Sequence, residues 1–201
     1  NGAGKTTMLN IITGKEDADE GRIVLAKGAQ IGYLEQEAIE MGERTIFEEV
    51  LSAQREILEQ ERRMRELEQS LGDDATESQL AAYGRARDNY EAMGGYQLES
   101  RVRSVLFGLG FTEGDMERMT SDFSGGWQMR IALAKLLTRN PEVLLLDEPT
   151  SNVDSINEGI ILKALKEQKN KKSIILVSHR ESTMAIADII YRVKDGRMLE
   201  C

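Results

Sequence analysis

The stretch Val143-Leu144-Leu145-Leu146-Asp147-Glu148 decides the fold. Its apolar run predicts a strand that is buried on both faces, which is typical of a parallel sheet covered by helices. The two carboxylates follow at the carboxyl end of the strand, where sheets of this kind bind their ligands. Asp147 is therefore a candidate ligand of Mg²⁺, and Glu148 is a candidate to polarise a water beside a phosphate. The alternative is an acidic pair that merely ends a strand at the surface.

The sequence on either side of this strand alternates between helical and strand patterns. After Ser124 we expect, in order, a helix over 125–139, the strand over 143–147, a helix over 156–168, a strand over 173–178, a helix over 180–187 and a strand over 189–193. Near the start of the chain we expect a helix over 5–12 and strands over 22–26 and 30–34. This alternation predicts an α/β fold with a mostly parallel sheet flanked by helices.

Residues 45–119 have a helical pattern instead. Apolar side chains recur at three- and four-residue intervals between Ile46 and Leu71, interrupted only by Gln60. A turn over 72–77 ends this helix, and a second helix repeats the spacing with Tyr83, Ala86, Tyr90 and Met93. Two such stripes predict an antiparallel helical hairpin over about 46–93, although both could instead pack flat on the main body. A third helix is expected over 97–109.

The composition fits one soluble globular domain. The chain has 201 residues, of which 40% are apolar and 30% are charged. No apolar run approaches the roughly 20 residues that cross a bilayer, and no signal peptide is evident, so we expect a cytoplasmic protein without direct membrane insertion. Cys201 is the only cysteine, which excludes a disulfide framework. The net charge of −9 disfavours non-specific binding to nucleic acid.

The first seven residues, Asn1-Gly2-Ala3-Gly4-Lys5-Thr6-Thr7, have the pattern of a phosphate-binding loop. Its small residues let backbone N–H groups approach phosphate oxygens, and the helix that follows adds its positive end. Lys5 would reach the β- and γ-phosphates, and the Thr6 hydroxyl would bind Mg²⁺. The alternative is that a glycine turn before a helix matches this sequence pattern by chance. Because the motif lacks its first two positions, we expect residues to be missing before Asn1.

The segment Phe123-Ser124-Gly125-Gly126-Trp127-Gln128 opens a helix. Ser124 can cap that helix, and the glycines expose its N–H groups to an anion. With this segment the sequence resembles the ATP-binding cassette (ABC) superfamily, whose LSGGQ-type signature is similar. The other motifs of the superfamily match in order: Gln36 resembles the Q-loop glutamine, 147–150 the Walker B region, 151–154 the D-loop and Ser178-His179 the H-loop.

The resemblance implies a single ABC ATPase domain over 1–201, with a P-loop NTPase core over 1–44 and 124–201 and a helical subdomain over 45–123. It implies ATP and Mg²⁺ as cofactors, with Glu148 and His179 as catalytic residues. The implied metal ligands are Thr6, Gln36 and Asp147. The implied nucleotide-binding residues are Asn1, Gly2, Ala3, Gly4, Lys5, Thr6, Thr7, Gln36, Ser124, Gly125, Gly126 and Asp154. In this superfamily the phosphate loop of one cassette faces the signature of another, so hydrolysis would require a homodimer or a tandem second cassette.

Up to about Asp147 the chain most resembles the ABC-F branch, soluble ATPases with two cassettes per polypeptide that act on ribosomes. The Trp-Gln-Met-Arg after the signature glycines, the segment 90–96 and the room for an inserted helical arm support this resemblance. The segment 151–154 departs from the Asn-His-Leu-Asp that is usual in that branch, and 176–184 resembles transporter ATPase subunits. The sequence could therefore be a mosaic, natural or assembled.

Three hypotheses for the role of the chain follow from the resemblance. An ABC-F translation factor would have the ribosome, rRNA or tRNA as partners, although nine acidic against four basic residues between Glu48 and Asp74 match rRNA poorly. A transporter ATPase subunit would have a membrane permease as partner, docked near Gln36 and the helical region. A chromosome-maintenance ATPase also joins a cassette to a coiled coil, but one that is far longer.

Overall fold

The computed structural model describes residues 4–35, 42–72, 74–194 and 196–200. At its centre lies a parallel sheet of three strands in the order β1-β2-β3, formed by β1 (Ile31–Leu34), β2 (Val143–Asp147) and β3 (Ser173–Val177). Leu144 pairs with Gly32 on one side and with Ile174 on the other. The prediction of a parallel sheet with its central strand over 143–147 is confirmed.

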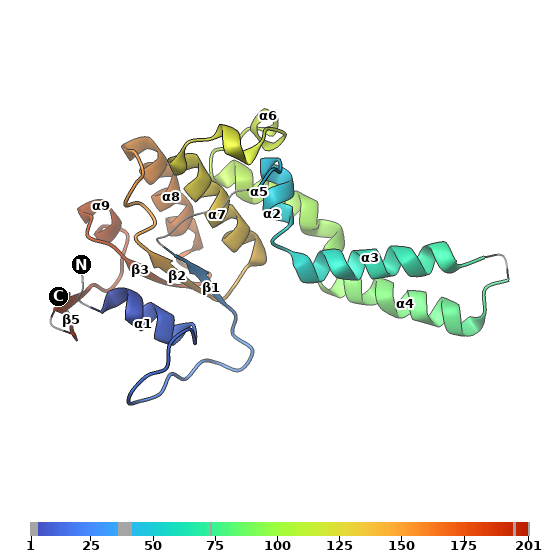
Figure 1. Cartoon of the computed structure of the whole chain (residues 1–201), viewed down its shortest axis with the longest axis horizontal. Coiled ribbons are helices and arrows are strands. Elements are labelled where there is room, and N and C mark those ends of the chain that lie inside the picture. Colours follow the sequence, from blue (N-terminus) through green and yellow to red (C-terminus); the bar gives the residue numbers. More distant parts are fainter. Residues whose placement is uncertain (1–3, 36–41, 73, 195, 201) are drawn as a thin grey trace.

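Helices cover both faces of this sheet (Figure 1). On one face lies α1 (Lys5–Ile12), whose Leu9 packs with Leu145 and Val177. On the other face Leu144 and Leu146 join the main core with α7 (Gly125–Arg139) and α8 (Ser155–Gln168). Successive side chains of a strand point to opposite faces, so a run of leucines is what a sheet covered on both faces requires.

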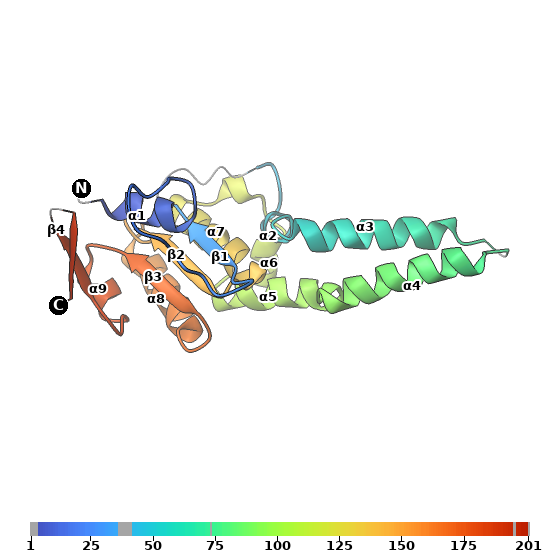
Figure 2. The ribbon, with the colours of Figure 1, turned by 90° about the horizontal axis from the view of Figure 1, so that it is seen from below.

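The helical region projects from this body as a hairpin (Figure 2). It consists of α3 (Arg55–Ser70) and α4 (Glu77–Ala92), and the predicted hairpin is confirmed. Ile57 and Met64 of α3 and Ala86 and Tyr90 of α4 are buried. Gln60, the interruption in the apolar stripe, donates from its side-chain amide to the carbonyl of Ala86 at 2.8 Å. A polar residue thus ties the two helices together inside the stripe.

The predicted continuous helix from Ile46 to Leu71 is wrong, because the chain turns over 52–54. The first part forms α2 (Ile46–Leu51), in which Glu49 is buried and pairs with Lys135 of α7. This pair holds α2 against α7 in the body of the domain. The chain must therefore turn after α2 before α3 can project away from the body. The same apolar spacing continues across the turn, which is why the sequence gives no sign of the break.

After the hairpin the chain returns to the body. It passes through η1 (Gly95–Gln97), α5 (Leu98–Gly108), α6 (Glu113–Met116) and η2 (Thr120–Asp122). The backbone N–H of Ile46 donates to Arg118, and that of Thr120 donates to Arg44, so the chain leaves and re-enters the body at one place. The domain boundaries at 44–45 and 123–124 stay a prediction.

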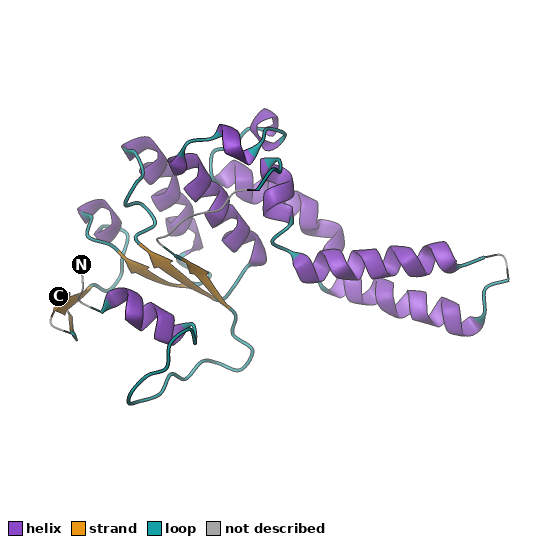
Figure 3. Cartoon of the chain, in the orientation of Figure 1, coloured by secondary structure: helices purple, strands orange, loops and turns teal. Residues whose placement is uncertain are grey.

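Two predicted strands differ from the structure. Residues 22–26 form a loop in which Ile23, Val24 and Leu25 are exposed (Figure 3). Among the described residues no strand pairs with this stretch, and an isolated strand has no partner for its backbone groups. The strand expected over 189–193 is β4 (Tyr191–Lys194), which pairs antiparallel with β5 (Arg197–Glu200) instead of extending the parallel sheet.

The helix expected over 180–187 is the single turn α9 (Glu181–Met184). Beyond α9, Ile186 still packs against the main core, but Ala187, Asp188 and Ile189 are exposed, so little apolar burial would stabilise a longer helix. Within the described ranges, every helix is too short or too polar to cross a membrane.

Candidate active site

Two of the predicted site residues meet directly where β2 ends and α1 begins. The Thr6 hydroxyl donates to Asp147 Oδ2 at 2.7 Å, and Asp147 is only 2% exposed. Gly4 precedes α1 with φ 86°, a left-handed conformation that glycine adopts without steric cost. Lys5 is half-buried in the first turn of this helix. A hydroxyl, a carboxylate and the N-terminal end of a helix therefore share one location.

Glu148 follows Asp147 and contacts His179. The distance between His179 Nδ1 and Glu148 Oε2 is 2.8 Å; the Glu148 side chain is 12% exposed and that of His179 is 71% exposed. Glu148 has φ 52°, a left-handed conformation that costs a non-glycine residue about 1–2 kcal/mol. Its backbone N–H donates to the carbonyl of Val177 at the end of β3. The acidic pair and the only histidine thus lie together at the carboxyl ends of β2 and β3.

The signature segment begins α7. Ser124 occupies the N-cap position with an extended backbone, but its side chain makes no capping hydrogen bond. Ser124 and Gly125 are exposed, whereas Gly126 is buried against Asn157 of α8. The first N–H groups of a helix have no partner within the helix. The hydroxyl and the helix start are therefore presented on the surface.

Asp154 caps α8. Its Oδ1 accepts from the backbone N–H groups of Ile156 and Asn157, both at 3.0 Å, and its Oδ2 accepts from the side-chain amide of Asn157. These hydrogen bonds from Asn157 hold the pKa of Asp154 below its usual range. Both carboxylate oxygens are used within the chain, and a contribution of Asp154 to nucleotide binding stays a prediction.

Four of the predicted site residues, Asn1, Gly2, Ala3 and Gln36, lie outside the described residues. Thr7 is exposed one position after Thr6. The structure therefore brings Thr6 to Asp147 and Glu148 to His179, and places Ser124 at the start of a separate helix.

The sequence matches the family model described as ABC transporter over residues 1–151. The chain belongs to this ABC family. It is 34% identical over 202 residues to the uncharacterized ABC transporter ATP-binding protein YfmM of Bacillus subtilis strain 168, a match that covers 98% of the chain and 39% of YfmM. It is 32% identical over 191 residues to ABC transporter F family member 5 of Arabidopsis thaliana, covering 89% of the chain and 26% of that protein. The chain thus spans well under half the length of these relatives.

The fold of the cassette is shared with solved structures. One is a dimeric ATP-binding cassette in a post-hydrolysis state with ADP and Pi bound, which aligns with a TM-score of 0.62 at 22% identity. The alignment covers 99% of this chain and 81% of that one. Helices on both faces of the parallel sheet agree with that likeness.

Sequence reasoning missed the residues that hold the segment 151–154 in place. The side-chain amide of Asn157 donates to Asp154. The guanidinium of Arg180, the residue directly after His179, donates to the carbonyl of Ser151. An arginine directly after the histidine was the available signal, but a charged residue on a loop is more often solvated. Trp127 packs in an aromatic cluster with Phe111 and Phe123 and contacts the Arg130 guanidinium.

Proposed function

We propose that this cassette binds MgATP and hydrolyses it together with a second cassette. One observation carries the proposal: Thr6 contacts Asp147, and the adjacent Glu148 contacts His179. Phosphate binding, metal binding and water activation need groups of these types at one edge of the sheet. Membership of the ABC family supports the same chemistry.

The contact between Thr6 and Asp147 fits Mg²⁺. A hydroxyl and a carboxylate are hard oxygen donors, and Mg²⁺ in nucleotide sites is typically held by one or two such groups together with the phosphates. Thr6 and Asp147 would hold the ion, with Gln36 as a further ligand. The ion would neutralise charge on the phosphate oxygens.

Glu148 would orient the attacking water. His179 contacts Oε2 of its carboxylate, and Oε1 would accept a hydrogen bond from the water. Lys5, in the first turn of α1, supplies positive charge for the phosphates. Each residue thus acts on a different part of the reaction: the phosphates, the metal or the water.

A second cassette would complete the site. Ser124 and Gly125 are exposed at the start of α7, where helix N–H groups suit an anion brought by another molecule. Preorganised donors of this kind contribute about 100- to 1,000-fold in rate. The dimeric state named for the similar solved cassette supports this arrangement.

The biological role that we favour is a cytoplasmic ABC-F translation factor with the ribosome, its rRNA or tRNA as partner. The projecting hairpin α3–α4 and the similarity to an F family member support it. The alternative is the ATP-binding subunit of a transporter that docks on a membrane permease, favoured by the D-loop sequence 151–154 and the segment 176–184. Cosedimentation of the ATP-bound full-length protein with ribosomes, rather than with membranes, distinguishes the two.

The catalytic proposal is tested with two variants of the full-length protein. Glu148→Gln should keep ATP binding and lose most turnover, because an amide cannot act as a base. Lys5→Ala should weaken ATP binding itself. Glu181→Gln, which changes an exposed carboxylate on α9, is the matched control and should behave as wild type. Undiminished phosphate release by Glu148→Gln would refute the assignment.

A further inference from the structure

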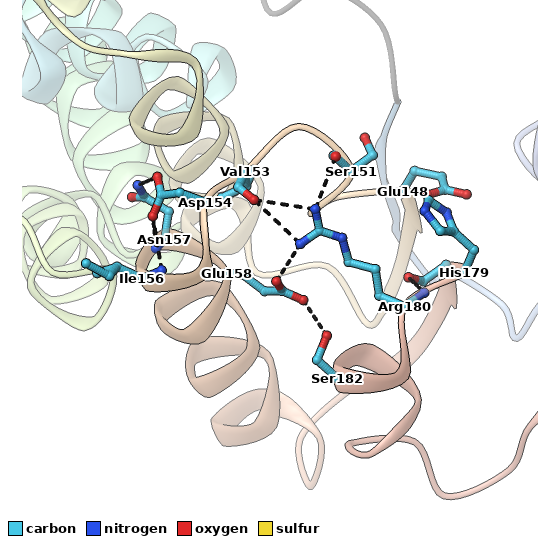
Figure 4. A network of polar contacts seen from close by, with 11 residues as sticks. Glu148, Ser151, Val153, Asp154, Ile156, Asn157, Glu158, His179, Arg180 and Ser182 are labelled. Atoms are coloured by element: carbon cyan, nitrogen blue, oxygen red, sulfur yellow. Dashed lines mark hydrogen bonds and ion pairs between the residues drawn. The ribbon is translucent and has the colours of Figure 1, made fainter.

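Arg180 connects the loop that carries His179 to the turn that follows Glu148. Its Nη2 donates to the carbonyl of Ser151 at 3.2 Å, and both Nη atoms lie 3.5 Å from the carbonyl of Val153 (Figure 4). A guanidinium presents several N–H groups in one plane, so a single side chain can hold two carbonyls of one turn.

A second anchor fixes the guanidinium. Arg180 Nη1 forms an ion pair with Glu158 of α8, whose other carboxylate oxygen accepts from the Ser182 hydroxyl. The side chains of Arg180 and Glu158 are 28% and 12% exposed, so solvent screens this pair less than it screens a surface pair. The ion pair thereby restrains Arg180 against α8.

The turn that Arg180 holds is the one that sets the backbone of Glu148. The N–H of Ser151 donates to the carbonyl of Glu148 at 3.1 Å, which closes the turn directly after the strand. The left-handed φ of Glu148 is strained, and strain of this kind persists only where the surrounding structure enforces it. The carbonyl of Val177 restrains Glu148 from one side. Arg180 restrains it from the other, through the turn.

We propose that Arg180 is a positioning residue that sets the geometry of the Glu148–His179 pair. It acts on His179 as its direct neighbour in the chain and on Glu148 through the carbonyls of the turn. The inference rests on the proposed function, because it assigns to Arg180 the orientation of the group that activates water. Arg180 would act through these contacts and not as a catalytic residue.

The test compares steady-state MgATP hydrolysis by variants of the full-length protein. Arg180→Gln should lower kcat about 10- to 100-fold, since a misplacement of about 1 Å in a catalytic group can cost 100-fold, while KM for ATP stays within about twofold. Arg180→Lys can keep the ion pair with Glu158 but not both carbonyls, so its kcat should be intermediate. Ser182→Ala is the matched control: it removes a contact of Glu158 without touching the turn and should leave kcat within about twofold.

Thermal unfolding and the split between kcat and KM separate positioning from a structural role. A low kcat with unchanged KM and melting temperature, partly rescued in Arg180→Lys, supports the inference. An unchanged kcat in Arg180→Gln overturns it, as does a loss of kcat that only follows a loss of folded protein in both Arg180 variants. A wild-type protein that hydrolyses no MgATP overturns the proposed function as well, so the two failures are distinguishable.

Discussion

Two adjacent glycines at the start of α7 should respond oppositely to the same substitution. A Cβ atom added at Gly126 would lie 3.0 Å from the side-chain nitrogen of Asn157 and 3.2 Å from its Cγ. A Cβ atom at Gly125 would meet no atom within 4 Å. Gly125→Ala is therefore an internal control for Gly126→Ala, with the same chemical change in the same helical turn.

The magnitudes follow from these distances. Replacing glycine by alanine where the backbone permits it stabilises a protein by about 0.4–1 kcal/mol, which we expect for Gly125→Ala. At Gly126 the methyl group must displace Asn157, whose amide is bound to Asp154 and whose backbone N–H is part of the cap of α8. Overpacking of this kind costs about 1–3 kcal/mol. We therefore expect the free energy of unfolding of Gly126→Ala to lie about 1–3 kcal/mol below that of Gly125→Ala.

Urea denaturation followed by circular dichroism measures both variants against wild type. A double variant, Gly126→Ala with Asn157→Ala, removes the obstacle and should recover stability relative to the sum of the single changes, by about 1 kcal/mol. If Gly126→Ala is as stable as Gly125→Ala, the contact between α7 and α8 is not as tight as the structure has it. If the double variant shows no coupling, Asn157 is not the obstacle.

Two further predictions concern Asp154 and the second cassette. At neutral pH Asp154→Ala should lower the melting temperature, whereas Asp154→Asn, which can also cap a helix, should change it less. The pKa of Asp154 is depressed in the folded state, so its charge stabilises the fold above the unfolded pKa of about 3.9. This stabilisation is lost as the pH falls through the folded pKa. The melting temperatures of wild type and Asp154→Asn should therefore converge in acid. If the second cassette is a copy of this chain, mixing Glu148→Gln with Ser124→Arg should restore roughly a quarter of wild-type turnover, since half of the pairs are mixed and each has one intact site. No recovery from two variants that still dimerise would contradict a role of Ser124 across the interface.

Much of the fold could be predicted because its decisive signals are local. The segment 143–147, with its three leucines, is a strand in the structure, and the helices over 5–12 and 125–139 have the expected bounds. In the structure Thr76 and Gln79 also form a capping box at the start of α4, a further local signal that the sequence analysis did not use. In these segments the residues that determine the element lie inside it.

The errors arose where an element depends on a distant partner. The segment 22–26, apolar after Arg22, is compatible with a strand, but the described part of the chain provides no neighbouring strand for it. The strand β4 was predicted, but its antiparallel pairing with β5 was not. The sequence pattern indicates that a segment can form a strand, but it does not identify the strand with which that segment pairs. The turn at 52–54 depends on the pair between Glu49 and Lys135, which lie far apart in the sequence.

The candidate site divides in the same way. Thr6, Asp147, Glu148 and His179 could be found from the sequence because their side chains belong to motifs with fixed spacing. The restraints on the turn after Glu148 could not be found from the sequence, because they act on backbone carbonyls, which every residue has. The guanidinium of Arg180 binds the carbonyls of Ser151 and Val153 whatever side chains those positions carry. Substitutions at Ser151 that preserve the backbone should therefore leave this contact intact, and Arg180 is where the restraint can be removed.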